Sequence, residues 1–269
     1  MGLLQCSMRK IIKRLTRRLV IVELQAPTHL LRRLLAATGY FRLRTLIASR
    51  GEPVLDSNLY RPLYSPWEGD AEFEKAYRPI RSLTLVSRER CHILWKTLQQ
   101  ALHLQGDFME CGVFRGGTAL LAAQTLAGKL DNERALHLYD SFKGMPKTID
   151  GIDGFRSGDF DRTSVEAVTQ LLSPYPFVKL HPGFIPDTFA DSNIPAVAWA
   201  HVDVDIYKSV QDCIDYIYPR LVRGGFLLFD DYGFPSCSST RRAVDEAFSA
   251  RPEVPLCLPT GQCLVVKVG

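Results

Sequence analysis

The sequence predicts an α/β fold, a doubly wound and mostly parallel sheet of seven strands that ends in an antiparallel hairpin and follows a helical N-terminal extension. Three observations support this prediction. Short apolar segments alternate with amphipathic helical segments from residue 107 onward, which is typical of parallel βα units. The last two apolar segments are separated only by Pro259-Thr260-Gly261, and such a short connection favours a hairpin. A chain of 269 residues can form one such domain of about 200 residues with an extension.

The extension, residues 1–50, is strongly basic and is predicted to be helical. It contains eleven Lys or Arg residues and a single acid, Glu23, whereas the rest of the chain has an excess of acids. Apolar residues recur at three- and four-residue steps over 8–22, with basic residues on the opposite face, and a second helix is expected over 28–38. Residues 51–80 begin with a stretch rich in Pro, Gly, Asp and Ser and are predicted to form a linker or lid.

Residues 81–269 are predicted to form the catalytic or binding domain, which begins with a helix over 83–104. The strands of this domain are expected at 107–114, 135–142, 177–184, 196–205 and 224–232, with the hairpin at 254–258 and 262–268. The intervening helices are expected at 117–127, 163–172, 207–219 and 239–249.

The first predicted strand continues into a glycine-rich turn, Glu110-Cys111-Gly112-Val113-Phe114-Arg115-Gly116-Gly117-Thr118, and then into a helix. Glycines at such a turn let the backbone approach a ligand closely, and the helix N-terminus can bind an anion. The pattern G-x-G-x-x-G is missing, so the nicotinamide fingerprint is absent. Glycine-rich turns of this kind also serve simply as tight packing turns, so the turn by itself does not identify a ligand.

Asp140 ends the second predicted strand, at the usual distance after a glycine-rich turn for an acid that accepts hydrogen bonds from ribose hydroxyls. Such an acid can instead cap a helix or lie in solvent. With the glycine-rich turn upstream, the ribose role is favoured, and the two features together predict a nucleoside-binding site.

Four acids follow the next two neighbouring strands. Asp203 and Asp205 are two residues apart at the end of one strand, so they should share a face, and Asp230 and Asp231 end the following strand. Parallel strands joined by a single crossover helix are neighbours, and their carboxyl ends lie at the ligand-binding edge of the sheet. Four carboxylates at one edge repel one another unless a cation neutralises them, and oxygen ligands suit Mg2+, Mn2+ or Ca2+. The alternative is that these acids are helix caps and ion-pair partners.

Several classes of protein are disfavoured. The seven cysteines are scattered without a C-x-x-C pair, which argues against a disulfide framework or a zinc site and favours a cytoplasmic setting. We expect no signal peptide or membrane-spanning segment, because no apolar run reaches the required length of roughly 18 residues. No nucleic-acid-binding motif accompanies the basic extension. The helix at 8–22 could contact the inner membrane surface, but it could equally pack on the acidic domain, mediate oligomerisation or bind a polyanion.

Five motifs occur together in the order and spacing of a known family: MECGVFRGGTA, LYDSFKGMP, HPGFIPDTF, HVDVDIY and FDDYG. Through them the chain, over roughly residues 80–250, resembles the macrocin O-methyltransferase family, the sugar O-methyltransferases of macrolide and aminocoumarin biosynthesis. The resemblance implies a Rossmann-like methyltransferase fold that binds S-adenosyl-L-methionine and Mg2+. It also implies a small hydroxylated, sugar-containing substrate, and we further expect a homo-oligomer that does not bind nucleic acid.

The resemblance assigns roles to particular residues. It implies metal ligands at Asp203, Asp230 and Asp231 and a general base at Asp205. The implied cofactor-binding residues are Glu110, Cys111, Gly112, Val113, Phe114, Gly116, Thr118, Asp140, Ser141, Phe142, Gly183 and Phe184.

The sequence also allows another general base and two other functions. His181 and His201 are other possible bases, although a histidine within an apolar strand is more often a core residue whose hydrogen bonds are satisfied. A catechol-type O-methyltransferase would use the same metal chemistry on an aromatic diol. A cofactor-binding protein without catalysis, recruited to a membrane by the basic helix, is a third possibility, against which the four clustered acids argue.

Overall fold

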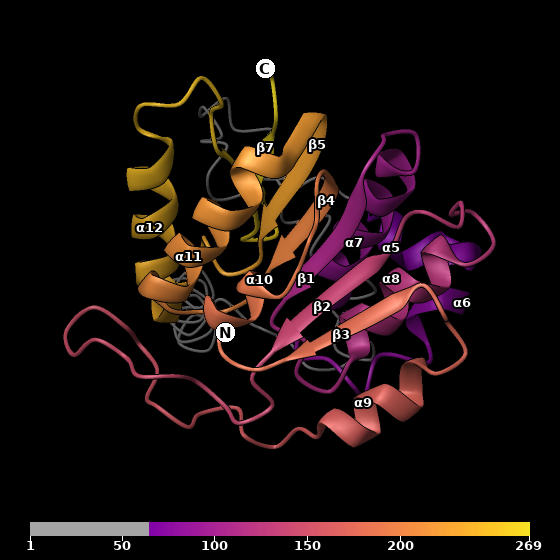
Figure 1. Ribbon diagram of the computed structural model, residues 1–269, viewed down its shortest axis with the longest axis horizontal. Coiled ribbons are helices and arrows are strands. Elements are labelled where there is room, and N and C mark those ends of the chain that lie inside the picture. Colours follow the sequence, from indigo (N-terminus) through magenta and orange to yellow (C-terminus); the bar gives the residue numbers. More distant parts are fainter. Residues whose placement is uncertain (1–64) are drawn as a thin grey trace, which may run out of the picture. The chain divides into compact units, whose positions relative to one another are not determined.

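The computed structural model describes residues 65–269 (Figure 1). The predicted helices at 8–22 and 28–38, and with them the suggested membrane contact, lie outside the described residues. Over the described part of the chain, no helix is both long enough and apolar enough to cross a bilayer.

A single seven-stranded sheet organises the described residues, in the order β3-β2-β1-β4-β5-β7-β6. The first five strands are mutually parallel, while β7 is antiparallel to both β5 and β6. The predicted mostly parallel sheet with an antiparallel C-terminal pair is therefore confirmed. The strands are β1 (Asp107–Cys111), β2 (Leu136–Asp140), β3 (Val178–Pro182), β4 (Val197–Val202), β5 (Leu221–Phe229), β6 (Leu256–Cys257) and β7 (Cys263–Val266).

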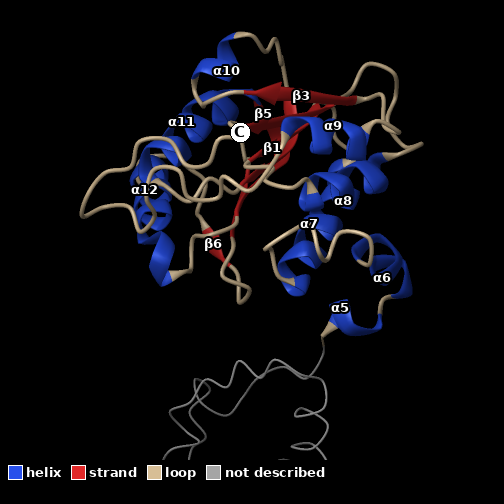
Figure 2. Cartoon of the chain, turned by 90° about the horizontal axis from the view of Figure 1, so that it is seen from below, coloured by secondary structure: helices blue, strands red, loops and turns tan. Residues whose placement is uncertain are grey.

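Helices cover both faces of the sheet, as Figure 2 shows from a second direction. One face carries α5 (Pro66–Gly69), α6 (Ala71–Tyr77), α7 (Arg88–Ala101), α8 (Gly117–Leu126) and α9 (Val165–Leu172). The other face carries α10 (Asp187–Ala190), α11 (Tyr207–Ile217) and α12 (Ser238–Phe248). Two short 3-10 helices, η1 (Tyr218–Arg220) and η2 (Pro235–Cys237), precede β5 and α12.

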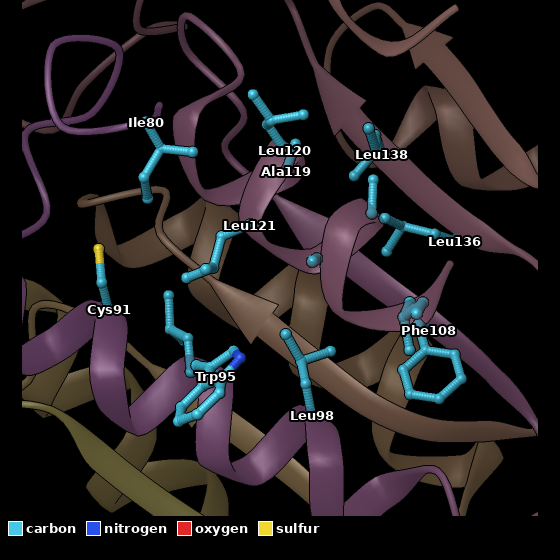
Figure 3. Close-up of a cluster of buried hydrophobic side chains, with 14 of the residues drawn as sticks. Ile80, Cys91, Trp95, Leu98, Phe108, Ala119, Leu120, Leu121, Leu136 and Leu138 are labelled. Carbon is cyan, nitrogen blue, oxygen red and sulfur yellow. The ribbon is translucent and has the colours of Figure 1, made fainter. Parts of the chain in front are cut away.

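Successive residues of each strand contribute to opposite layers of the core, because side chains alternate along a strand. On β1, Phe108 packs with the layer of α7 and α8, whereas Met109 packs with the layer of α11 and α12. Figure 3 shows the first layer, in which Trp95 and Leu98 of α7 lie near Leu121 of α8 and the sheet. The central strands β1, β2 and β4 are buried on both faces, which explains why they read as continuous apolar segments in the sequence.

Residues 65–80 are part of the folded domain, so the expectation of a linker or lid over 51–80 was wrong for this part. They form α5 and α6, and the side chains of Phe73 and Ile80 are fully buried. Phe73 packs against the rings of His92 and Trp95 on α7. Two of the residues that suggested a linker begin helices: Pro66 opens α5, and the Asp70 carboxylate caps α6 by accepting a hydrogen bond from the N–H of Phe73.

Candidate active site

The carboxyl ends of the parallel strands meet at one edge of the sheet, where a cavity of about 280 Å³ opens. The arrowheads of β1 to β5 in Figure 1 point to this edge. The ladder places Cys111 of β1 opposite Val202 of β4, and Val202 opposite Phe229 of β5. The residues that follow these three strands, the glycine-rich turn and the two acid pairs, are therefore brought to the same cavity.

Gly112 lets the glycine-rich turn contact the strand that carries the first acid pair. Its φ is +92°, and a Cβ atom added there would lie 1.9 Å from the carbonyl oxygen of Asp203. No side chain fits in that space, so the backbones after β1 and β4 touch because this residue is glycine. The close approach sets the distance between the turn and the acids.

We expect Gly112→Ala to disrupt this part of the protein, because both the positive φ and the clash with Asp203 oppose a side chain. Gly128→Ala is the matched control, since Gly128 also has a positive φ (+69°) but has no atom within 4 Å of the added Cβ. The control should cost only about 1 kcal/mol of unfolding free energy, whereas Gly112→Ala should cost several times more and abolish methyl transfer. Thermal unfolding and activity assays on both variants test this, and equal losses in the two would contradict the role of the contact.

Asp140 ends β2 and organises the glycine-rich turn directly. One oxygen of its carboxylate accepts hydrogen bonds from the N–H groups of Val113 and Phe114, both at 2.8 Å, and the other accepts from the N–H of Phe142 at 2.7 Å. The first turn of α8 has no side-chain cap, and Thr118 in that turn lines the cavity. The N–H groups of Val113 and Phe114 bond to Asp140, so an anion in the cavity would have to bind the N–H groups at the start of α8.

The cofactor-binding residues expected from the sequence separate into two groups. Eight line the cavity: Gly112, Val113, Phe114, Thr118, Asp140, Ser141, Gly183 and Phe184. Four do not line it: Glu110, Cys111, Gly116 and Phe142. The side chain of Glu110 is buried against His201, that of Cys111 lies in the core, and Gly116 is the N-cap of α8.

All four acids of the predicted metal and base half line the cavity. Side-chain atoms of Asp203 and Asp230 lie within 4.8 Å of each other and of His201, and those of Asp205 and Asp231 lie within 4.8 Å of each other and of Cys237. The expectation that Asp203 and Asp205 share a strand face was wrong, because β4 ends at Val202. The chain instead turns sharply at Asp205, whose φ is +57°.

The electrostatic environment of three of these acids opposes their ionisation. Burial raises the pKa of Asp203 well above its usual value, and the neighbouring charges of Asp231 and Asp230 raise it further. Burial and Asp231 likewise raise the pKa of Asp205, and burial raises that of Asp231. Burial is the largest cause of each shift, and the charges of neighbouring carboxylates add to it.

Asp230 differs because positive groups surround it. Burial alone would raise its pKa, but the hydrogen bond and charge of His201 and the charge of Arg90 lower it. Arg90 on α7 forms an ion pair with Asp230 and lies 3.8 Å from Asp231, and Gln262 donates a hydrogen bond of 2.8 Å to Asp230. Sequence reasoning missed both Arg90 and Gln262; the one available signal was a polar residue, Gln262, at the start of an apolar strand.

His201 is fully buried between two acids and does not line the cavity. Its Nδ1 lies 2.9 Å from the Glu110 carboxylate and its Nε2 lies 3.4 Å from that of Asp230. Burial would lower the pKa of His201, but these two carboxylates raise it to about 9. His181 also lies off the cavity, stacked between His137 and Tyr139. Of the three candidate bases, Asp205 is the one that reaches the cavity.

Solved structures of O-methyltransferases share this fold. The O-methyltransferase NovP matches 86% of the chain and 98% of its own length, with a TM-score of 0.63 and 22% identity. The calicheamicin methyltransferase CalS11 matches 73% of the chain and 93% of its own length, with a TM-score of 0.59 and 17% identity. The fold is that of the Rossmann-like O-methyltransferases.

The particular family follows from the sequence. The profile of the macrocin O-methyltransferase family matches residues 65–255. The chain is 30% identical to mycinamicin III 3''-O-methyltransferase of Micromonospora griseorubida over 183 residues, which are 62% of this chain and 71% of the relative. It is also 30% identical to demethyldecarbamoylnovobiocin O-methyltransferase of Streptomyces niveus over 186 residues, 62% of this chain and 68% of the relative. The chain belongs to the macrocin O-methyltransferase family, as the sequence motifs predicted, and is an O-methyltransferase.

Proposed function

We propose that the protein transfers the methyl group of S-adenosylmethionine to a hydroxyl of a sugar on a glycosylated metabolite, with Mg2+ bound by Asp203, Asp230 and Asp231 and with Asp205 as general base. One observation carries the proposal: the glycine-rich turn and the four acids line the same cavity. A methyl donor bound at the turn and a hydroxyl bound at the acids would therefore be adjacent, which a transfer reaction requires.

The residues present fit a divalent cation. Asp203, Asp230 and Asp231 offer carboxylate oxygens, the donors that Mg2+ prefers. Two positive side chains, Arg90 and His201, contact the acid cluster, which leaves the four carboxylates only partly compensated. Burial raises the pKa of Asp203 and of Asp231, and the charges of neighbouring carboxylates raise both further. A bound Mg2+ would supply charge neutralisation and would lower the pKa of a coordinated hydroxyl.

The chain's own residues would perform the remaining steps. The start of α8 has no side-chain cap and contributes Thr118 to the cavity, so its N–H groups would suit the carboxylate of the methionine part of the donor. S-adenosylmethionine supplies the methyl group on a positively charged sulfur. The carboxylate of Asp205 would accept the proton that leaves the acceptor hydroxyl. Burial of Asp205 and the charge of Asp231 raise its pKa, which makes it a stronger base than an exposed aspartate.

The class of acceptor is inferred from the relatives. The names of two of them specify methylation of mycinamicin III at a 3'' position and of demethyldecarbamoylnovobiocin. We propose a glycosylated natural product for this chain as well. Apolar cavity walls, among them Phe155, Phe160 and Phe234, would suit the apolar part of such a molecule.

The experiment is a methyl-transfer assay with the full-length protein and radiolabelled S-adenosylmethionine. The acceptors are mycinamicin III, demethyldecarbamoylnovobiocin and a simple catechol, each tested with Mg2+ and with EDTA. We expect labelled product from a glycoside, at least 100-fold less in EDTA, and none from the catechol. Product from the catechol alone would replace the sugar with an aromatic diol as acceptor, and equal rates in EDTA would refute the metal.

A further inference from the structure

The backbone at Asp205 is held in an uncommon conformation. Its φ of +57° is unusual for a residue with a side chain, and the N–H of Ile206 donates a hydrogen bond of 2.6 Å to the carbonyl of Val204. A hydrogen bond between residues two apart, across a centre with positive φ, defines a tight three-residue turn that is rare because it is strained. Such strain persists only where surrounding contacts stabilise it, and it occurs preferentially at functional sites.

Two buried hydroxyl groups from another element bind this turn. Ser239 and Thr240, in the first turn of α12, donate hydrogen bonds of 3.2 Å and 3.1 Å to the carbonyl oxygen of Asp205. Both side chains are 2% exposed. Serine and threonine at a helix start usually cap their own helix, but α12 has no side-chain cap. Their hydroxyls are instead directed at a residue more than thirty positions earlier in the chain.

A third group contacts the side chain of Asp205. Cys237, which immediately precedes α12 and is 2% exposed, donates a weak hydrogen bond of 3.6 Å from its thiol to Oδ1 of Asp205. The segment 237–240 therefore contacts both the main-chain carbonyl and the carboxylate of the same residue. This segment lies only a few residues after Asp231. The stretch of chain that follows β5 therefore supplies Asp230 and Asp231 and also contacts Asp205.

We propose that Ser239 and Thr240 are positioning residues, which hold the backbone turn at Asp205 so that its carboxylate faces the cavity beside Asp231. The consequence for catalysis rests on the proposed role of Asp205 as the base. Without the two hydroxyls, the turn at Asp205 would relax to a negative φ and redirect the carboxylate away from the acceptor. Other groups of the site, including the turn after β1, would keep their places.

The test compares the double variant Ser239→Ala/Thr240→Val with Thr240→Ser, which keeps a hydroxyl, and with Thr125→Val. Thr125 is a matched control, because its buried hydroxyl also donates to a carbonyl, that of Leu121, but lies outside the cavity. With mycinamicin III as acceptor, we expect the double variant to lose about 100-fold in kcat, roughly tenfold for each hydrogen bond. Thr240→Ser should stay near wild type, and calorimetric affinity for S-adenosylmethionine should be unchanged in all variants.

A crystal structure of the double variant with S-adenosylhomocysteine gives a second readout that needs no acceptor. We expect a negative φ at Asp205 and a displaced carboxylate. An unchanged turn, a kcat equal to that of Thr125→Val, or parallel losses of kcat and of S-adenosylmethionine affinity would each overturn the proposal. Failure of the base assignment is distinguishable, because Asp205→Asn would then retain activity while the turn still relaxes in the double variant.

Discussion

Asp205→Asn should reduce kcat by about 100- to 1000-fold while binding of S-adenosylmethionine and of Mg2+ persists. The amide has the size of the carboxylate and asparagine tolerates a positive φ, so the turn at Asp205 should keep its shape. The amide cannot accept a proton at neutral pH, and loss of a general base typically costs this much in rate. Single-turnover kinetics with mycinamicin III and calorimetry with S-adenosylmethionine and Mg2+ measure the separate effects.

The control for this change is Asp215→Asn, which makes the same substitution at an exposed position of α11. It should leave kcat and both affinities at wild-type values. If Asp205→Asn keeps a kcat within threefold of the wild type, Asp205 is not the base. If it loses Mg2+ binding together with activity, its role is that of a metal ligand rather than a base.

Asp203→Asn should have two opposite effects, a loss of methyl transfer and a gain in stability. Burial and the charges of Asp231 and Asp230 raise the pKa of Asp203 above its unfolded value, so this carboxyl group destabilises the metal-free protein at neutral pH. A neutral amide removes this repulsion and can donate a hydrogen bond to Asp231. The metal-free protein should gain about 1–2 kcal/mol of unfolding free energy, and Tm should rise by about 2–8 °C.

The same substitution should remove the response to metal. Wild-type protein should gain Tm on addition of Mg2+, because a ligand that binds only the folded state stabilises it, whereas Asp203→Asn should show little or no gain. Its rate of methyl transfer should fall at least 100-fold. Two results would contradict the assignment of Asp203 as a metal ligand. One is a variant that is less stable than the wild type without metal, and the other is a variant whose Tm still rises with Mg2+.

The order of strands and helices could be predicted because the central strands β1, β2 and β4 are buried on both faces of the sheet, and a helical pattern or a short turn separates each apolar segment from the next. The convergence of the glycine-rich turn and the four acids followed from the same rule, since parallel neighbours end at one edge. The seven-stranded topology and the family were therefore accessible from local patterns and from the spacing of motifs.

Contacts between distant segments could not be read from the sequence. Arg90 reaches Asp230 across 140 positions, and nothing in the helix around Arg90 distinguishes it from a surface arginine. Pro66 and Asp70 of α5 and α6 resemble loop residues in the sequence, and what joins these helices to the folded domain is the burial of Phe73 against α7. The sequence predicts that the strand continues through Asp203 and Asp205, whereas the chain turns at Asp205. This turn is held by hydroxyl groups of α12, which are distant in the sequence.

We propose that the carboxylates after β4 and β5 bind one divalent cation. The test is titration calorimetry of Mg2+ into the full-length protein. The protein is first stripped of metal with EDTA, dialysed and saturated with S-adenosylhomocysteine. We expect one Mg2+ to bind per chain of the wild type and of Asp215→Asn, and none to bind to Asp203→Asn. The absence of Mg2+ binding to the wild type, or equal binding to Asp203→Asn, would contradict it.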